Sequence, residues 1–423
     1  VLEAVPGVII SQHSGEGKAN QYYLRGFNLD HGTDFATSVA GVPVNMPTHA
    51  HGHGYSDLNF LIPELIAGVQ FNKGPYAAEE GDFSTAGASH IRYVNELDKP
   101  IVRLSAGGEG WLRAFAAASP QLAGGHMLAA IEAGHNDGPW ERPDDFSKVN
   151  GVLRYSRGNS RNAFSLTGIG YSADWQATDQ IPERAVESGL VGRFGGIDDS
   201  LGGSTARYSA SADWQRTASP GVTRVTAYAM KYRLNLVSNF TYFLDDPVNG
   251  DEFEQADRRF VFGGRATHRM GGRIAHRPSE FLFGVDLRRD NIGTVGLYHT
   301  RDRARLETIR EDSVHQTSVG AFARHDFQWS PWLRSTVGLR ADRFDFDVDA
   351  GNPLNSGQES DAIVSPKASL ILGPWASTEL YINWGEGFHS NDARGATITV
   401  DPKSGEPADR VTPLVRARGE DAG

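Results

Sequence analysis

Three histidines alternate along one short segment of the chain, at His49, His51 and His53. In an extended chain, positions i, i+2 and i+4 point to one face, and two interspersed glycines allow a tighter loop, so the three imidazoles can converge. Imidazole is a good ligand for zinc, copper, nickel and iron, and the segment is therefore a candidate metal site. Four further residues lie close enough in sequence to contribute, namely His31, Asp34, Tyr55 and Asp57.

The same segment admits other interpretations, which the sequence leaves open. The histidines could hydrogen-bond an organic ligand or neighbouring loops without any metal, or they could be solvated or packing residues. A metal-dependent hydrolase is the weakest interpretation, because such sites need further ligands and a base, and the other histidines of the strand region are scattered singly. The chain also lacks a Ser-His-Asp order and a glycine-rich phosphate loop, so we expect no enzyme.

Composition excludes several classes of protein. The 423 residues contain no cysteine, which removes disulfides, thiolate metal sites and cysteine nucleophiles. The formal net charge is -11 and the arginines are scattered singly, so we expect no nucleic-acid partner. No stretch approaches the ~18 consecutive apolar residues of a membrane helix, whereas a barrel with a polar lumen is compatible with the composition.

The first 97 residues have a mixed pattern. Short strands are predicted near residues 21–24, 37–39 and 69–73. Residues 57–66 have the apolar spacing of a helix, although Pro63 interrupts it. Together these elements predict a small α+β domain.

A period of two dominates the remainder of the chain, from residue 98 to residue 423. Val337 and Leu339, for example, alternate with polar neighbours that include Arg340 and Asp342, and such strands recur about a dozen times. An antiparallel up-and-down sheet is the simplest arrangement for strands that follow one another in this way.

Connections between the predicted strands alternate in length. Short turns at 157–160 and 218–221 contrast with long polar segments at 174–204 and 237–256, a pattern typical of outer-membrane barrels. Tryptophans stand at strand ends, where the aromatic girdles of such barrels lie. These residues are Trp175, Trp214, Trp329, Trp332 and Trp375.

Several glycine-containing motifs follow one another in the first region: Leu24-Arg25-Gly26, residues 39–44 with Gly41, Lys73-Gly74-Pro75, Gly81-Asp82-Phe83-Ser84 and Ala86-Gly87. In this order they resemble the plug domain of TonB-dependent outer-membrane receptors. The resemblance implies a plug domain at residues 1–97, followed by the first part of an antiparallel up-and-down transmembrane β-barrel at residues 98–423. It implies about 22 strands in the full barrel, so we expect a fragment of a longer receptor.

The resemblance also implies a function. We expect a receptor in the bacterial outer membrane that takes up a scarce ligand actively, with TonB of the inner-membrane complex, outer-membrane lipid and a small molecule or metal chelate as partners. No cofactor is expected beyond a transported metal or metal chelate. A passive porin-like or structural barrel is the alternative from another class.

The resemblance assigns structural or gating roles to the plug motifs, at Arg25, Gly26, Gly41, Lys73, Gly74, Pro75, Gly81 and Gly87. It places the histidine segment at the plug apex, where His49, His51, His53 and Tyr55 would contact the ligand. We further expect Arg25 and Lys73 to pair with barrel carboxylates, of which Asp286, Asp342 and Glu379 are candidates.

Overall fold

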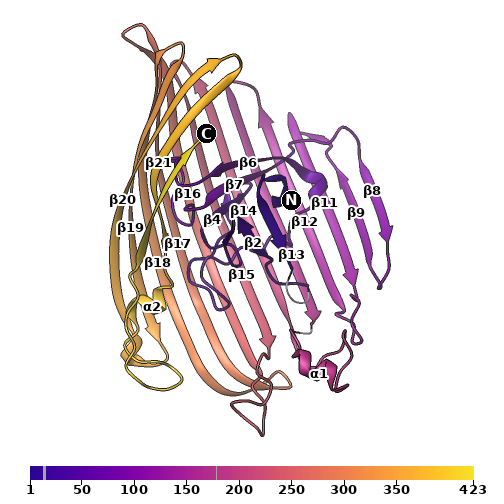
Figure 1. Cartoon of the computed structure of the whole chain (residues 1–423). Helices are drawn as coiled ribbons and strands as arrows, with labels where there is room; N and C mark the ends of the chain where they lie inside the picture. Colours follow the sequence, from indigo (N-terminus) through magenta and orange to yellow (C-terminus); the bar gives the residue numbers. More distant parts are fainter. Residues whose placement is uncertain (13–15, 178) are drawn as a thin grey trace.

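The computed structural model describes residues 1–12, 16–177 and 179–423. It consists of two small sheets near the N-terminus and one large antiparallel sheet of 15 strands. In Figure 1 the large sheet curves around the small ones, which lie on its concave side. No helix within the described ranges is long and apolar enough to cross a membrane.

The two small sheets contain the strands β1 (Val8–Ser11), β2 (Gln21–Leu24), β3 (Phe27–Asn28), β4 (Phe35–Val39), β5 (Val42–Pro43), β6 (Ile66–Lys73) and β7 (Gly87–Tyr93). The first sheet has the order β1-β2-β3, and the second has the order β5-β4-β7-β6. Only β4 and β7 pair in parallel among these strands of the described chain. The predicted strands of this region are confirmed.

The helix predicted at residues 57–66 is wrong. This segment contains one 3-10 turn, Pro63–Leu65, and a second 3-10 turn of the same length, Leu2–Ala4, lies at the start of the chain. Pro63 cannot donate the hydrogen bond that an α-helix needs in its interior. Asp57 also accepts a hydrogen bond from the Asn59 backbone at 2.8 Å, which favours a turn. The apolar residues of this segment, such as Leu61, Ile62 and Leu65, are buried in the core, but they pack there without forming a helix.

The large sheet runs almost entirely in chain order, from β22 at one edge to β8 at the other. Its strands are β8 (Ile101–Ala106), β9 (Leu112–Ala118), β10 (Gln121–Leu122), β11 (Gly125–Asn136), β12 (Phe146–Gly158), β13 (Asn162–Gln176), β14 (Gly202–Ala218), β15 (Gly221–Ser238), β16 (Phe253–Ile274), β17 (Arg277–Arg301), β18 (Ala304–Ser330), β19 (Leu333–Ala350), β20 (Gly357–Trp375), β21 (Thr378–Ser390) and β22 (Leu414–Ala422). The short helices α1 (Glu183–Glu187) and α2 (Ala393–Thr397) lie in long connections.

The two faces of the large sheet are inverted relative to a water-soluble sandwich. On β19 the apolar side chains of Val337 and Leu339 are more than half exposed, while Arg340 and Asp342 are buried. The charged face therefore turns inward, toward the small sheets, and the apolar face turns outward. This arrangement confirms the alternation read from the sequence and matches the pattern of a membrane barrel with a polar interior.

The ends of the strands differ in the length of their connections, as predicted. Exposed tryptophans stand beside the short turns at Trp329, Trp332 and Trp375, and the last two stack with ring centroids 6.2 Å apart. Trp175 departs from the prediction, because only 2% of it is exposed. It packs inward against the plug, where its ring occupies the space beside Gly17.

The domain from residue 1 to β7 is called the plug below, and the large sheet is called the wall. One hydrophobic cluster joins them, since Leu24, Phe60 and Ile62 of the plug belong to the same buried set as Leu128 and Tyr171 of the wall. Residues 94–100 connect β7 to β8. The division into domains at residue 97 stays a prediction.

Candidate functional site

The histidine segment, residues 48–55, lies on the side of the plug that faces the long connections of the wall. The Thr48 hydroxyl accepts a hydrogen bond from the Ala393 backbone of α2 at 2.9 Å and donates to Gln316 of β18. Helix α2 belongs to the connection between β21 and β22. The segment is therefore positioned by a long loop and by strand ends on the same side.

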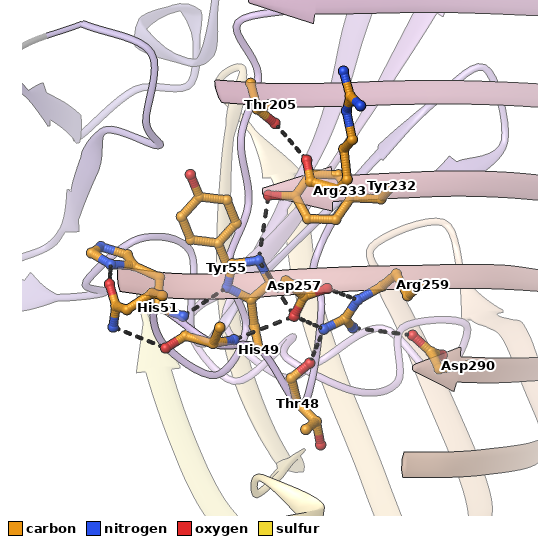
Figure 2. A network of polar contacts seen from close by, with 12 residues as sticks. Thr48, His49, His51, Tyr55, Thr205, Tyr232, Arg233, Asp257, Arg259 and Asp290 are labelled. Atoms are coloured by element: carbon orange, nitrogen blue, oxygen red, sulfur yellow. Dashed lines mark hydrogen bonds and ion pairs between the residues drawn. The ribbon is translucent and has the colours of Figure 1, made fainter. Parts of the chain in front are cut away.

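Strand β16 fixes the backbone of this segment through three residues that share one face of the strand. Gln255 donates to the Ala50 carbonyl oxygen at 2.9 Å, and Asp257 accepts from the Ala50 backbone at 3.3 Å. Arg259 donates to the Thr48 carbonyl oxygen, as Figure 2 shows. Residues at i, i+2 and i+4 of one wall strand thus hold the backbone of the plug loop at Thr48 and Ala50.

His49 is a packing residue in this arrangement. Its ring stacks on Tyr55 with centroids 4.2 Å apart and 7° between the planes, and its Nε2 contacts the Tyr232 hydroxyl at 3.3 Å. Only 1% of His49 is exposed, and burial, followed by the nearby Arg259 charge, holds the pKa of its imidazole well below the usual value. The neutral, enclosed ring of His49 therefore packs between Tyr55 of the plug and Tyr232 of the wall (Figure 2).

Tyr55 forms the centre of the same cluster. Its side chain is 1% exposed, and its hydroxyl accepts a hydrogen bond from the Ala19 backbone at 2.9 Å. His51 approaches the Tyr55 ring edge-on, with centroids 5.6 Å apart. Tyr55 is thus a buried platform for two histidines.

His51 is only partly buried and turns away from His49. Its Nδ1 contacts the Gln255 side-chain oxygen at 2.9 Å, and its Nε2 lies 3.1 Å from Nε2 of His31. Burial, followed by the charge of His31, lowers the pKa of His51 to about 4, so this imidazole is neutral at pH 7. The sequence named His31 as a possible contributor to the site, and the structure places its imidazole in direct contact with that of His51.

His53 faces a third set of partners. Its ring lies 5.4 Å from that of His389 and 6.1 Å from that of Phe83, measured between centroids. The structure therefore divides His49, His51 and His53 among separate surroundings instead of converging them. Gly54 contributes to this divergence, because its φ of +78° turns the chain directly after His53.

A group with metal-like spacing does occur elsewhere among the described residues. His135, Asp137 and Asp145 lie at the end of β11 and in the connection that follows, with ligand atoms within 4.8 Å of one another. The His135 imidazole already contacts Asp137 at 3.3 Å and Asp145 at 3.9 Å through different ring nitrogens. Ordinary ion pairing therefore accounts for this group.

The plug motifs lie at tight turns and at contacts with the wall. Gly26, Gly41 and Gly74 have φ values of +83°, +81° and +72°, which side chains rarely adopt. A Cβ on Gly81 would stand 2.6 Å from the Arg340 guanidinium, and one on Gly87 would stand 2.5 Å from the Asn72 carbonyl oxygen. These glycines permit close approach of plug and wall, or of strands within the plug.

The Lys73-Gly74-Pro75 motif docks on the last strands of the wall. The Pro75 carbonyl oxygen accepts a hydrogen bond from Lys367 at 2.7 Å. A Cβ on Gly385 of β21 would stand only 2.5 Å from that oxygen, and Gly419 of β22 is similarly close to the proline ring. Glycines on the wall therefore form the surface that receives this motif.

The expected pairing of Arg25 with a barrel carboxylate is confirmed, but its partner is none of the three candidates. Arg25 pairs with Asp421 of β22 at 3.4 Å, whereas the Lys73 ammonium lies over the Phe71 ring at 5.9 Å. The three expected carboxylates instead pair with arginines of their own sheet, in the pairs Asp286 with Arg265 and Arg340, Asp342 with Arg340, and Glu379 with Arg334.

Several charged contacts at the interface join cations of the wall to hydrogen-bond acceptors of the plug. Arg288 donates to the Asn45 carbonyl oxygen at 2.9 Å, Arg265 donates to that of Glu79 at 2.9 Å, and Arg324 pairs with the Glu79 carboxylate. Wall arginines commonly have an aspartate two residues away on the same strand face, in the pairs 257/259, 288/290, 324/326 and 340/342. This spacing, Asp-x-Arg at 257/259 and Arg-x-Asp in the other three pairs, is visible in the sequence and is the signal that sequence reasoning missed.

Comparison with known proteins agrees with this geometry. A family model described as "TonB dependent receptor-like, beta-barrel" matches residues 134–410, and one described as "TonB-dependent Receptor Plug Domain" matches residues 1–88. Similar solved structures share the fold at low sequence identity.

Three of these solved structures are described here. The ferric citrate transporter FecA in the unliganded form is 12% identical with a TM-score of 0.77, and the match covers 93% of this chain and 60% of that one. The copper transporter OprC is 16% identical with a TM-score of 0.74, covering 100% and 65%. The siderophore receptor PiuA from Acinetobacter baumannii is 12% identical with a TM-score of 0.71, covering 100% and 66%.

The chain thus spans about two thirds or less of the length of the solved receptors that it matches. Both parts of the family's architecture are present, because the plug model and the barrel model match in the order in which the structure places the small sheets and the wall. The chain belongs to the family of TonB-dependent receptors, whose members are outer-membrane β-barrel transporters and receptors.

Proposed function

We propose that this chain is part of an outer-membrane transporter that imports a scarce ligand by TonB-driven rearrangement of its plug. The observation that carries the proposal is the polar contact between plug and wall. Arg288 and Lys367 donate to plug carbonyl oxygens, while Glu64 of the plug forms a two-point ion pair with Arg113 of β9 at 2.8 Å. A passive pore has no use for a domain bound inside it in this way.

Such contacts also explain why energy is needed. Each buried charge pair or charged hydrogen bond is stable in place and costly to break singly, because its partner is left without compensation. Opening a path past the plug therefore needs work from outside the receptor. We propose TonB of the inner-membrane complex as the source, and outer-membrane lipid as the surroundings of the apolar face.

The ligand class that we propose is a metal ion or metal chelate. It is supported by the imidazole-rich surface of residues 48–55 on the side of the long connections, since His51 and His53 are both partly exposed there. Imidazole suits borderline metals such as zinc, copper and nickel. Similar solved structures include a ferric citrate transporter, a copper transporter and a siderophore receptor.

Uptake by cells tests this function. The full-length gene is expressed in a deletion strain, with and without a working TonB, under limitation of iron, zinc, copper and nickel in turn. We expect the receptor to restore growth and accumulation of one metal only when TonB is present. Equal accumulation without TonB would identify a passive barrel instead.

A further inference from the structure

The contact between His31 and His51 has a feature that ordinary packing does not explain. Nδ1 of His31 lies 2.8 Å from the Ala19 carbonyl oxygen and 3.3 Å from that of Asn20. A carbonyl oxygen can only accept a hydrogen bond, so Nδ1 of His31 must bear a proton. In the neutral ring, the lone pair is then on Nε2.

The tautomer of His51 is fixed in the same way. The Gln255 side-chain nitrogen donates to the Ala50 carbonyl oxygen at 2.9 Å, which sets the orientation of the amide. The remaining amide oxygen faces Nδ1 of His51 at 2.9 Å, so this nitrogen donates. Nε2 of His51 is therefore also the atom with the lone pair.

Two lone pairs consequently face each other across 3.1 Å, between Nε2 of His31 and Nε2 of His51. Two neutral acceptors at this distance repel, whereas a cation between them converts repulsion into coordination. Nitrogens that bind one zinc ion at 2.0–2.1 Å with tetrahedral angles are roughly 3.3 Å apart. The observed spacing of the two imidazoles is close to that of a ligand pair.

A carboxylate stands beside the pair. Oδ1 of Asp30 lies 3.7 Å from Nε2 of His31, and the Asp30 side chain is 54% exposed, so it can turn without disturbing the core. Oδ2 of the same carboxylate also approaches the position of Gly52, next to His51 in the chain. Two imidazoles and one carboxylate form a donor set suited to divalent first-row transition metals.

We propose that His31 and His51 bind one divalent transition-metal ion through their Nε2 atoms, with Asp30 as a third ligand. The site differs from the three-histidine site predicted from the sequence, because His49 and His53 take no part in it. A role for the site in capturing cargo rests on the proposed function, whereas metal binding by the site does not.

Direct titration tests the site. The full-length receptor is purified in detergent without a histidine tag, stripped of metal with a chelator, and titrated calorimetrically with zinc, copper and nickel chlorides. We expect one equivalent to bind, and we expect His31→Gln and His51→Gln each to weaken binding by at least about tenfold. His126→Gln on β11 is the control, since it removes a partly buried imidazole that contacts Glu96 and lies outside the histidine segment, and we expect unchanged binding.

Two further measurements distinguish loss of the metal site from misfolding of a variant. Heat-dependent mobility on SDS gels reports whether each variant retains a folded barrel, and Asp30→Asn changes an exposed residue that the fold tolerates. We expect Asp30→Asn to weaken binding less than either histidine variant. In the wild-type protein, the paramagnetic resonance spectrum of bound copper(II) is expected to show coupling to two imidazole nitrogens.

Each outcome is decisive. Absence of binding, or equal binding by the wild type and both folded glutamine variants, overturns the site. Loss of binding in a folded His53→Gln variant overturns it in favour of the loop histidines acting together. TonB-dependent uptake by a receptor that binds none of the three free metals would refute this site and leave the proposed function intact. Metal binding at this site without TonB-dependent uptake would refute the proposed function and leave the site intact.

Discussion

Arg259 and Asp257 stand two residues apart on β16 and form a two-point ion pair inside the receptor, with nitrogen to oxygen distances of 2.6 and 2.8 Å. Both side chains are fully buried, and both reach the plug, because Arg259 donates to the Thr48 carbonyl oxygen while Asp257 accepts from the Ala50 backbone (Figure 2). The opposite charges of the two side chains compensate each other. Their further hydrogen bonds, to the Thr48 carbonyl oxygen and from the Ala50 backbone, hold the histidine segment.

Breaking this pair is expected to destabilise the receptor. Arg259→Met leaves the Asp257 carboxylate and the Thr48 carbonyl oxygen buried without their partner, which costs about 3 to 5 kcal/mol. Thermal unfolding of the full receptor in detergent should show a clearly lower midpoint. Arg343→Met is the matched control, because Arg343 pairs with Asp345 at the same spacing but on the exposed face, and its midpoint should not change.

The glycine surface that receives the Lys73-Gly74-Pro75 motif is a second target. Gly385→Ala places a methyl group 2.5 Å from the Pro75 carbonyl oxygen, so the plug or β21 must shift, at a cost of about 1 to 3 kcal/mol. We expect faster proteolysis of the plug in this variant. Gly271→Ala on β16 meets no atom within 4 Å and should leave the proteolysis rate unchanged. Equal rates in the two variants would mean that Pro75 does not dock against β21.

The period of two in the sequence was sufficient to predict most strands of the wall, but not all strands and not their full lengths. Alternation identified the strands from β8 to β21 except β10, because an apolar outer face and a charged inner face leave a period of two in the sequence. It missed the two-residue strand β10, the last strand β22, and the parts of β17 and β18 that lie within residues 291–313. Hydrogen bonding to neighbouring strands, which no local pattern records, extends these strands.

The site was less predictable for a related reason. Regular spacing suggested that His49, His51 and His53 would converge, but spacing describes a segment in isolation. The His49 ring contacts Tyr232 of the wall and the His51 ring contacts Gln255 of β16. The His53 ring instead lies beside Phe83 and His389. The proximity of His31 to His51 depends on the path of the chain between them, so single-sequence reasoning could not select it.

Acidity should affect stability through Asp57 of the plug. Burial raises the pKa of this carboxyl from 3.8 to about 6, while the Asn59 backbone hydrogen bond opposes the shift. In the unfolded chain the Asp57 carboxyl loses its proton near pH 4, whereas in the folded protein it keeps the proton up to about pH 6. Folding is therefore most favoured by this group below pH 4, and its contribution disappears as the pH rises through 6.

The variant Asp57→Asn isolates this contribution, because asparagine can still accept the Asn59 hydrogen bond but cannot ionise. A shift of about two pH units corresponds to about 3 kcal/mol, so the variant should unfold at a higher temperature than the wild type at pH 8. The two proteins should have equal midpoints at pH 4. A constant difference between them across this range would contradict a raised pKa at Asp57.

Movement of the plug can be tested with an engineered crosslink, since the chain contains no cysteine of its own. A Cβ on Gly41 would lie 3.9 Å from Cβ of Thr226 on β15, within the range that a disulfide spans. The double variant Gly41→Cys and Thr226→Cys, oxidised in full, ties the plug to the wall. The backbone at Gly41, with a φ of +81°, adds a strain of about 1 to 2 kcal/mol that both oxidation states share.

We expect the oxidised double variant to lose TonB-dependent uptake and to recover it on reduction, because the strain persists while the crosslink is removed. The pair Gly395→Cys and Val411→Cys is the control, since its Cβ atoms are also 3.9 Å apart but both lie in the connection between β21 and β22. Its uptake should be the same before and after reduction. Full uptake by the oxidised variant with cysteines at positions 41 and 226 would show that the ligand passes while the plug stays attached to β15 at this point. The path for the ligand would then have to open at another part of the interface.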